Sequence, residues 1–239
     1  MINRDTIALV TGANRGIGAA LVEALAVEGI SKVYAGMRSP SSFDRTAWPD
    51  SVVPIELDVT KPDQVERAAS ATADVTMLFN NAGVLSFGDI MTTSFADIEA
   101  NLSVNYLGAL RVARAWAPVI EQNGGGAMIN TLTLVALASM PGLSVYNASK
   151  AAAWSMTQSL RASLSDRNIK VHSVSPGAVD TDMLAGVEMD KANPADIAKA
   201  ILAGVAKGNE DIFPDAMSTS LYQAWASDHK AVEKQFAAM

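Results

Sequence analysis

The stretch that decides the fold is "TGANRGIG", residues 11–18, which directly follows the apolar run "TIALV" of residues 6–10. Apolar side chains then recur at helical spacing up to Gly29, a natural residue for a helix end. The order strand, glycine-rich turn and helix places backbone N–H groups and a helix N-terminus where they can hold a phosphate. Many glycine-rich turns are only turns, so the prediction of a nucleotide site depends on this order.

Strand-like and helix-like segments alternate through the rest of the chain. Further strands are expected at 32–37, 52–59, 75–80, 127–132, 169–175 and 210–215. Helices are expected at 62–72, 101–121, 145–166 and 194–206, with a helical tail from about 218 to 239. This alternation is typical of βαβ units, which build a parallel sheet with helices on both faces. The sequence shows no linker or repeat, so it predicts one doubly wound α/β domain, a Rossmann fold, over residues 1–239.

Composition disfavours several classes of function. The chain has no cysteine, which excludes disulfides, thiolate nucleophiles and cysteine-based zinc sites. Its two histidines, His172 and His229, have no partner at metal-ligand spacing, so no metal is predicted. A net charge of −7 argues against nucleic acid and membrane surfaces as partners. No run reaches the ~18 apolar residues of a membrane span, and a strand-like segment begins too early for a signal peptide. A cytoplasmic location is therefore expected.

The end of the second strand distinguishes the two nicotinamide cofactors. An acidic residue there binds the ribose 2′-hydroxyl, whereas an arginine accommodates a 2′-phosphate. This chain reads "AGMRS" (35–39), with Arg38 and no acid, and Arg15 lies in the glycine turn close to the same ribose. Either arginine alone is more simply a solvated surface cation, but two of them converging on one place favour NADP(H). A P-loop is excluded because no Lys-Ser or Lys-Thr pair follows the last glycine.

"YNASK", residues 146–150, places a tyrosine four positions before a lysine. Residues four apart share one face of a helix, so Tyr146 and Lys150 could both point into one site. The pair has little meaning alone, because the same spacing arises by chance in many helices. An interfacial aromatic beside a solvated lysine is the alternative.

Five motifs in order carry a resemblance to a known family. They are "TGANRGIG" (11–18), "NNAG" (80–83), "SVNYLG" (103–108), "YNASK" (146–150) and "SPG" (175–177). Each is modestly specific, but together in this spacing they strongly resemble the short-chain dehydrogenase/reductase family, in its compact single-domain branch. The resemblance covers the chain from about residue 5 to residue 183. The last quarter departs from the commonest bacterial members, because it has "EDIFPD" (210–215) and a further helix.

The resemblance implies catalytic roles for four residues. Tyr146 would donate a proton to a substrate carbonyl oxygen, and Lys150 and the oxidised nicotinamide would lower its pKa from the ordinary value of about 10. Lys150 would also hydrogen-bond the nicotinamide ribose. Thr133 lies thirteen residues before Tyr146, where the family usually has a serine, and would orient the carbonyl; Thr131 is the alternative. Asn105 would hold a water that links Lys150 to solvent.

The resemblance also implies how the cofactor is held. Asp58 would accept a hydrogen bond from the adenine amino group, although an aspartate that caps the turn after its strand is an equal alternative. The "NNAG" motif would shape the wall under the adenosine ribose, and the loop after "SPG" would contact the nicotinamide carboxamide. The implied cofactor-binding residues are Gly12, Asn14, Arg15, Gly16, Ile17, Gly18, Arg38, Asp58, Val59, Asn80, Ala82, Gly83, Tyr146, Lys150, Pro176, Gly177, Val179 and Thr181.

The expected substrate cleft is apolar. It would be formed by loops at 84–90, 134–145 and 178–193, whose stretches "LSF", "VALASMPG" and "MLAGVEM" contain no arginine or lysine. This disfavours carboxylate and phosphorylated substrates and favours a hydrophobic or aryl carbonyl. Candidate substrate contacts are Leu85, Val135, Met140 and Met183. The predicted activity is therefore NADPH-dependent, reversible reduction of a ketone or aldehyde to an alcohol.

Two other functions stay open at this point. The chain would be an NAD-linked alcohol dehydrogenase if Arg15 and Arg38 were bystanders. It would be a catalytically silent NADP(H)-binding sensor if the fold served binding alone, although such proteins typically lose the tyrosine or the lysine. The expected partner is a small carbonyl or alcohol. In the family, the small-residue helix at 147–165 pairs across a twofold axis, which implies a homodimer or homotetramer.

Overall fold

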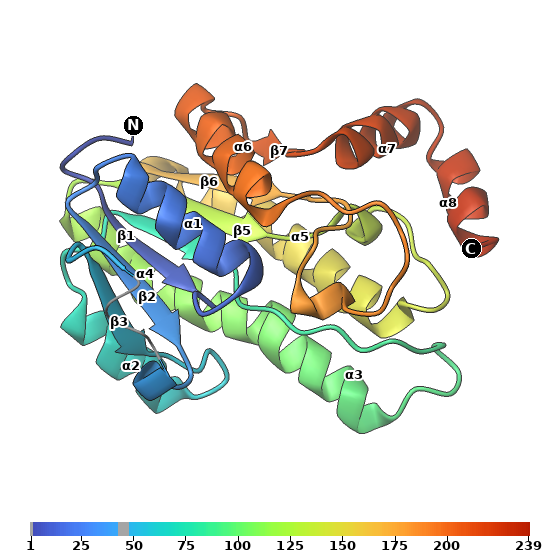
Figure 1. The fold of residues 1–239 in the computed structure, drawn as a ribbon, viewed down its shortest axis with the longest axis horizontal. Helices are drawn as coiled ribbons and strands as arrows, with labels where there is room; N and C mark the ends of the chain where they lie inside the picture. The colour runs from blue at the N-terminus through green and yellow to red at the C-terminus, as the bar shows by residue number, and fades with distance from the viewer. Residues whose placement is uncertain (1, 43–47) are drawn as a thin grey trace.

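One parallel sheet forms the centre of the computed structural model, which describes residues 2–42 and 48–239. Its strands are β1 (Ile7–Thr11), β2 (Lys32–Met37), β3 (Val52–Glu56), β4 (Met77–Asn80), β5 (Gly126–Thr131), β6 (Ile169–Val174) and β7 (Asp211–Ile212). The strand order is β3-β2-β1-β4-β5-β6-β7, with every neighbouring pair parallel. This confirms the predicted doubly wound α/β fold (Figure 1).

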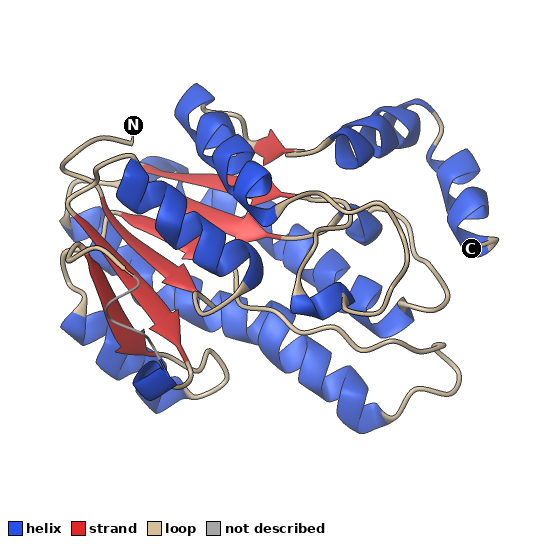
Figure 2. Cartoon of the chain, in the orientation of Figure 1, coloured by secondary structure: helices blue, strands red, loops and turns tan. Residues whose placement is uncertain are grey.

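Helices cover both faces of the sheet (Figure 2). The α-helices described in the structure are α1 (Gly16–Val27), α2 (Pro62–Ala71), α3 (Phe95–Leu102), α4 (Ala109–Gln122), α5 (Ser144–Leu164), α6 (Pro194–Lys207), α7 (Ala216–Ser227) and α8 (His229–Ala237). One apolar cluster joins α1 and α6 to one face of the sheet, and a second joins α2, α4 and α5 to the other. Among the helices described, none is long and apolar enough to cross a membrane.

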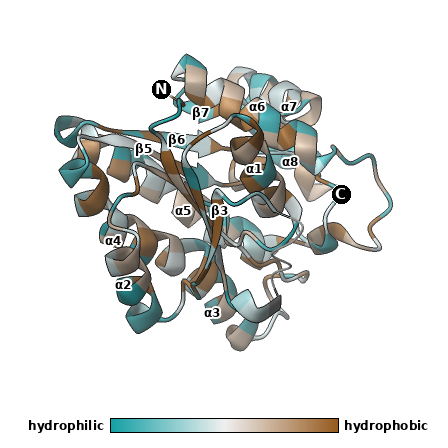
Figure 3. Ribbon diagram, turned by 60° about the vertical axis from the view of Figure 1, so that its left-hand side comes forward, coloured by the Kyte–Doolittle hydropathy of each residue, from teal (hydrophilic) through white to brown (hydrophobic). Residues whose placement is uncertain are grey.

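The strands are apolar on both sides because both sides are covered. In β1, Ala8 and Val10 pack toward α1 and α6, whereas Leu9 between them packs toward α4. Figure 3 shows hydrophobic colour along the middle of the sheet and on α1. The order of strands reverses between β1 and β4, and the crevice at the carboxyl ends of such a pair is where open α/β sheets bind ligands.

The long helix before β5 begins earlier than the sequence predicts. It starts at Phe95 instead of 101, because the Ser94 hydroxyl accepts a hydrogen bond from the Asp97 backbone N–H and caps the first turn. A π-helical turn at Ser103–Gly108 separates α3 from α4. This turn contains the "SVNYLG" motif and holds Asn105 inside the protein.

The C-terminal region also differs from expectation. The predicted strand at 210–215 is paired only over Asp211–Ile212, because Asp215 already caps α7 through its hydrogen bond from the Ser218 N–H. The tail is two helices rather than one. Asp228 lies between them, and its carboxylate caps α8 by accepting hydrogen bonds from the N–H groups of Lys230 and Ala231. In Figure 1 this pair, drawn in red, lies beyond the end of the sheet.

Candidate active site

A cavity of about 950 Å³ opens at the carboxyl ends of β1 and β4. It is large enough to hold one end of a dinucleotide together with a small substrate. Residues from every motif named above meet around it. The predicted residues that line it are Gly12, Asn14, Arg15, Gly16, Ile17, Arg38, Asp58, Val59, Ala82, Gly83, Leu85, Thr133, Val135, Met140, Tyr146, Lys150, Pro176, Gly177, Val179, Thr181 and Met183.

The glycine turn is packed against the end of β4. Gly12 has a φ of +66°, and a Cβ there would stand 2.9 Å from the Cα of Ala82. The Thr11 hydroxyl accepts hydrogen bonds from the N–H groups of Asn81 (3.0 Å) and Ala82 (2.9 Å). Arg15 precedes α1 but provides no side-chain cap, so the first N–H groups of that helix stay available for an anion.

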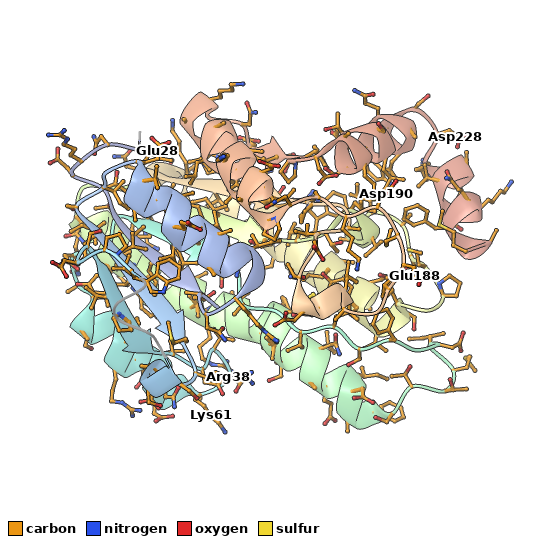
Figure 4. The ribbon with its side chains drawn as sticks, viewed as in Figure 1. Glu28, Arg38, Lys61, Glu188, Asp190 and Asp228 are labelled. Atoms are coloured by element: carbon orange, nitrogen blue, oxygen red, sulfur yellow. The ribbon has the colours of Figure 1, made fainter. Side chains whose placement is uncertain are left out.

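Basic side chains surround Asp58 at the outer end of the cavity. The carboxylate of Asp58 accepts hydrogen bonds from the N–H (2.9 Å) and hydroxyl (2.7 Å) of Thr60, so it does cap the turn after β3. Burial would raise the pKa of Asp58, but these hydrogen bonds and the charges of Arg38 and Lys61 outweigh it, and the pKa is lowered. Arg38 and Lys61 lie close together at this edge (Figure 4). The adenine contact of Asp58 stays a prediction.

The two arginines have different surroundings. Arg15 forms an ion pair with Asp182 at 3.0 Å, and both side chains are about two-thirds exposed. The guanidinium of Arg38 is exposed and forms no hydrogen bond or ion pair with residues 2–42 or 48–239. A 2′-phosphate would therefore meet Arg15, which is ion-paired with Asp182, and Arg38, which forms no such pair among the described residues although its charge acts on Asp58.

Tyr146, Lys150 and Thr133 meet at the inner end of the cavity. All three side chains are buried, although each reaches the cavity surface. The Tyr146 side chain is hydrogen-bonded with that of Thr133. The Lys150 Nζ lies 5.9 Å from the centre of the Tyr146 ring and donates a 2.7 Å hydrogen bond to the Thr131 carbonyl oxygen. Thr131 thus contacts Lys150 through its backbone, whereas Thr133 is the threonine whose side chain faces Tyr146.

Burial controls the protonation of this group. It raises the pKa of Tyr146 to about 12, and the hydrogen bond with Thr133 offsets only part of that rise. Burial also lowers the pKa of Lys150 to about 8. The expected lowering of the Tyr146 pKa by Lys150 is therefore not found in the protein by itself, because removing the phenol from water outweighs it. Burial therefore favours the uncharged form of both Tyr146 and Lys150, compared with the same groups in water.

Asn105 is held by the protein on both sides of its amide. Its Oδ1 accepts from the Val84 N–H (2.9 Å), and its Nδ2 donates to the Val84 carbonyl (2.8 Å) and the Ser149 hydroxyl (2.9 Å). Ser149 in turn donates to the Tyr146 carbonyl at 2.7 Å. A Cβ on Gly83 would lie 3.3 Å from Asn105 Oδ1 and 3.5 Å from Lys150 Nζ. Asn105 thus ties the loop after β4 to the turn of α5 that carries Tyr146.

With this geometry in place, the chain can be compared with known proteins. The family model described as short chain dehydrogenase matches residues 6–192. The chain belongs to this family. An uncharacterized oxidoreductase from Staphylococcus aureus (strain MRSA252) is 33% identical over 208 residues, covering 83% of this chain and 90% of the relative.

Solved short-chain dehydrogenases match almost the whole chain. One from Burkholderia cenocepacia, in complex with NADP, is 38% identical with a TM-score of 0.92 and covers 97% of each chain. Another from Sphingobium yanoikuyae, in complex with NADPH, is 26% identical with a TM-score of 0.83 and covers 96% of this chain and 95% of its own.

Three predicted site residues of this short-chain dehydrogenase do not line the cavity: Gly18, Asn80 and Asn105. Gly18 lies under the turn, where a Cβ would collide with the Gly12 carbonyl oxygen. Asn80 points to the α4 side, opposite to its strand neighbour Phe79, and its Nδ2 donates to the Ala109 carbonyl at 2.8 Å. Cofactor or catalytic roles for Gly18, Asn80 and Asn105 stay predictions.

The apolar end of the cavity contains residues that the sequence analysis missed. Besides the expected loops, it is lined by side chains of α7 and α8 and by the C-terminal residue: Met217, Ser220, Leu221, Ala224, Gln235, Phe236 and Met239. The spacing of Val232 and Phe236 does indicate a buried helix face. It does not indicate what that face covers.

His172 is a buried strand residue bonded to the Asn209 carbonyl, and the described residues contain no group of side chains suited to a metal.

Proposed function

We propose that this short-chain dehydrogenase catalyses NADPH-dependent reduction of ketones or aldehydes to alcohols. The observation that carries the proposal is the buried group of Tyr146, Thr133 and Lys150 at the inner end of a cavity with a phosphate-binding turn at its entrance. A proton donor, a hydroxyl beside it and a cation lie where a carbonyl and a nicotinamide can meet.

The residues present fit a dinucleotide. At Gly12, which has a φ of +66°, a Cβ would collide with the Ala82 backbone, so glycine lets this turn pack closely against the end of β4 beside the cavity. The uncapped N-terminus of α1 suits a pyrophosphate. Arg38 and Lys61 near Asp58 favour a 2′-phosphate over a free hydroxyl at the ribose. The NADP and NADPH complexes of related structures support the same choice.

The reaction needs one hydride and one proton. A bound nicotinamide would supply the hydride to the carbonyl carbon, and that chemistry belongs to the cofactor. The Tyr146 hydroxyl donates its proton to the carbonyl oxygen, so the C=O bond becomes an alcohol and Tyr146 is left as a phenolate. Thr133, bonded to the same hydroxyl, places the carbonyl oxygen within reach of the donor.

Lys150 stabilises the phenolate that this step leaves behind. Its ammonium lies near the Tyr146 ring in a buried site, where charge interactions are strong. Asn105 holds this arrangement through Ser149. A proton from solvent then restores the Tyr146 hydroxyl. The relay of this proton through a water at Asn105 stays a prediction.

Substrates of this site are uncharged and apolar near the carbonyl. Leu85, Val135, Met140 and Met183 line the inner cavity, and none offers a charge to a carboxylate or phosphate. We further propose that the protein forms homodimers or homotetramers that pair through α5. We also propose that it is located in the cytoplasm.

An assay of NADPH or NADH oxidation tests the function. Purified protein is mixed with NADPH or NADH and a panel of aryl and aliphatic ketones and aldehydes, and the fall in cofactor absorbance is followed. We expect turnover that is faster with NADPH, with the alcohol identified as product. Faster turnover with NADH would favour the NAD-linked alternative. Tight NADPH binding without turnover of any carbonyl would favour the silent sensor.

A further inference from the structure

The C-terminal helices α7 and α8 form one wall of the cavity. Their lining side chains, given above, carry no charge. Phe236 is buried and packs in one apolar cluster with Leu134, Val135 and Tyr146, although it lies ninety positions after Tyr146 in the chain. The end of the chain is therefore in the same cluster as the proposed proton donor.

The wall is anchored at its start. The Asp215 carboxylate that caps α7 also accepts a 2.9 Å hydrogen bond from the Gly177 N–H. A Cβ on Gly177 would stand 2.9 Å from both Asp215 Oδ1 and Met217 Sδ. The first turn of α7 is thus packed directly on the loop that follows β6, which lines the same cavity.

A row of aromatic rings anchors the middle of the wall. Phe213 stacks on Tyr222 with 4.1 Å between ring centres, and Tyr222 stacks on Trp225 at 6.2 Å. Trp225 meets Trp154 of α5 edge to face at 6.0 Å. Such aromatic pairs stabilise a packed arrangement beyond the burial of their surfaces. The wall is therefore tied to α5, the helix that carries Tyr146 and Lys150.

Adaptable side chains lie on both sides of this end of the cavity. Met140, Met183 and Met189 come from two loops opposite the wall, and Met217 and Met239 belong to the C-terminal side itself. Methionine is flexible and polarizable, so surfaces rich in it accept apolar groups of varied shape. The cavity between Tyr146 and α8 is therefore apolar on several sides.

We propose that α8, through Phe236, is the substrate-selecting wall of this enzyme and that its substrates are uncharged carbonyls with an aromatic or similarly bulky group directed at α8. This rests on the proposed function, because Tyr146 sets where the carbonyl lies. Phe236 selects by contact with the bulky group. It takes no part in the chemical step.

The test compares Phe236→Ala with wild type on two ketones. Acetophenone carries a ring that reaches the wall, whereas acetone does not. Losing an apolar contact of this size changes selectivity by about ten- to two-hundredfold. We expect the ratio of kcat/KM for acetophenone over acetone to fall at least about tenfold, mainly through KM for acetophenone. Phe236→Leu should restore much of the ratio because it restores apolar volume.

Controls separate selection from folding. Lys234→Ala removes an exposed side chain of α8 that does not line the cavity, and should leave the ratio within about twofold. The NADPH dissociation constant and the melting temperature show whether Phe236→Ala keeps its fold. If it does not, Phe236→Val, which is smaller than leucine, replaces it. A ratio within about twofold of wild type in folded Phe236→Ala, or in Phe236→Val where the alanine variant does not fold, would overturn the proposal.

Binding gives a readout that does not need turnover. Acetophenone is titrated into the NADP⁺ complex, which cannot reduce it, while the fluorescence of Trp225 and its neighbours is followed. Weaker acetophenone binding in Phe236→Ala, by about tenfold, supports the wall even if the wild type reduces neither ketone. Unchanged binding overturns the proposed role of Phe236 in substrate selection even if the wild type reduces both ketones. A wrong assignment of Phe236 and a wrong assignment of the reaction are thus distinguishable.

Discussion

The two ends of the cavity are built in different ways. The proposed cofactor end consists of backbone groups and cations that lie close to glycines in the sequence, from Gly12 to Gly18 and around Arg38. The proposed substrate end consists of apolar side chains from the loops after β4, β5 and β6 and from the C-terminal helices. A phosphate site of this kind depends on local geometry, whereas the apolar end has a shape that only the complete fold creates.

The largest effect is expected at the glycine turn, where Gly18→Ala should abolish NADPH binding and destabilise the protein. A Cβ at Gly18 collides with the Gly12 carbonyl oxygen, which is backbone and cannot move aside. Thermal unfolding and NADPH titration measure both results. Gly142→Ala is the matched control, since a Cβ there meets nothing within 4 Å. A Gly18→Ala protein that melts and binds like wild type would contradict the packing described for this turn.

The next effect separates the two arginines. Arg38→Ala should weaken NADPH binding by about ten- to a hundredfold, the size of one lost hydrogen bond to a charged group. Arg15→Ala should cost less, because Asp182 already compensates its charge. Dissociation constants for NADPH and NADH are measured for both variants. Equal losses for both cofactors would show that neither arginine binds the 2′-phosphate.

A pH dependence follows from the buried lysine. Burial lowers the pKa of Lys150 to about 8, so its ammonium is present below that pH and is lost as the pH rises through it. Tyr146, with its pKa raised to about 12, stays protonated over the same range. The kcat/KM for NADPH in the reductive direction should therefore fall about tenfold per pH unit above pH 8. A flat profile up to pH 10 would argue against a role for the Lys150 charge.

The smallest effect is expected at the ion pair beside the glycine turn. Asp182→Asn frees Arg15 for the cofactor and should tighten NADPH binding about two- to fivefold, in keeping with the modest strength of exposed ion pairs. The gain should shrink at high salt. Asp190→Asn makes the same charge change in the same loop and serves as the control (Figure 4). Weaker binding by Asp182→Asn would indicate that the pair holds the loop in place for the cofactor.

Most of the fold could be predicted because its signals are local. The strand β2 was expected at 32–37 and is found there, since a run buried on both faces is continuous and apolar. The start of α3 was missed because its signal is a single cap at Ser94. The break between α7 and α8 was missed for the same reason at Asp228.

The candidate site could be predicted in part. The interval of thirteen residues that the family resemblance implies led to Thr133 before Tyr146, and the structure brings these two side chains together. The direction of Asn80 was missed, since it depends on which face of β4 meets α4. The contribution of Phe236 could not be predicted, because nothing near it in sequence indicates that it packs in one cluster with Tyr146.

The most direct measurement compares binding and turnover in Tyr146→Phe. NADPH affinity is taken from a fluorescence titration, and reduction of the best ketone from absorbance. If Tyr146 is the proton donor, the variant should bind NADPH within a few-fold of wild type and lose about a hundred- to ten-thousandfold in kcat. Turnover that survives the loss of the Tyr146 hydroxyl would contradict the account.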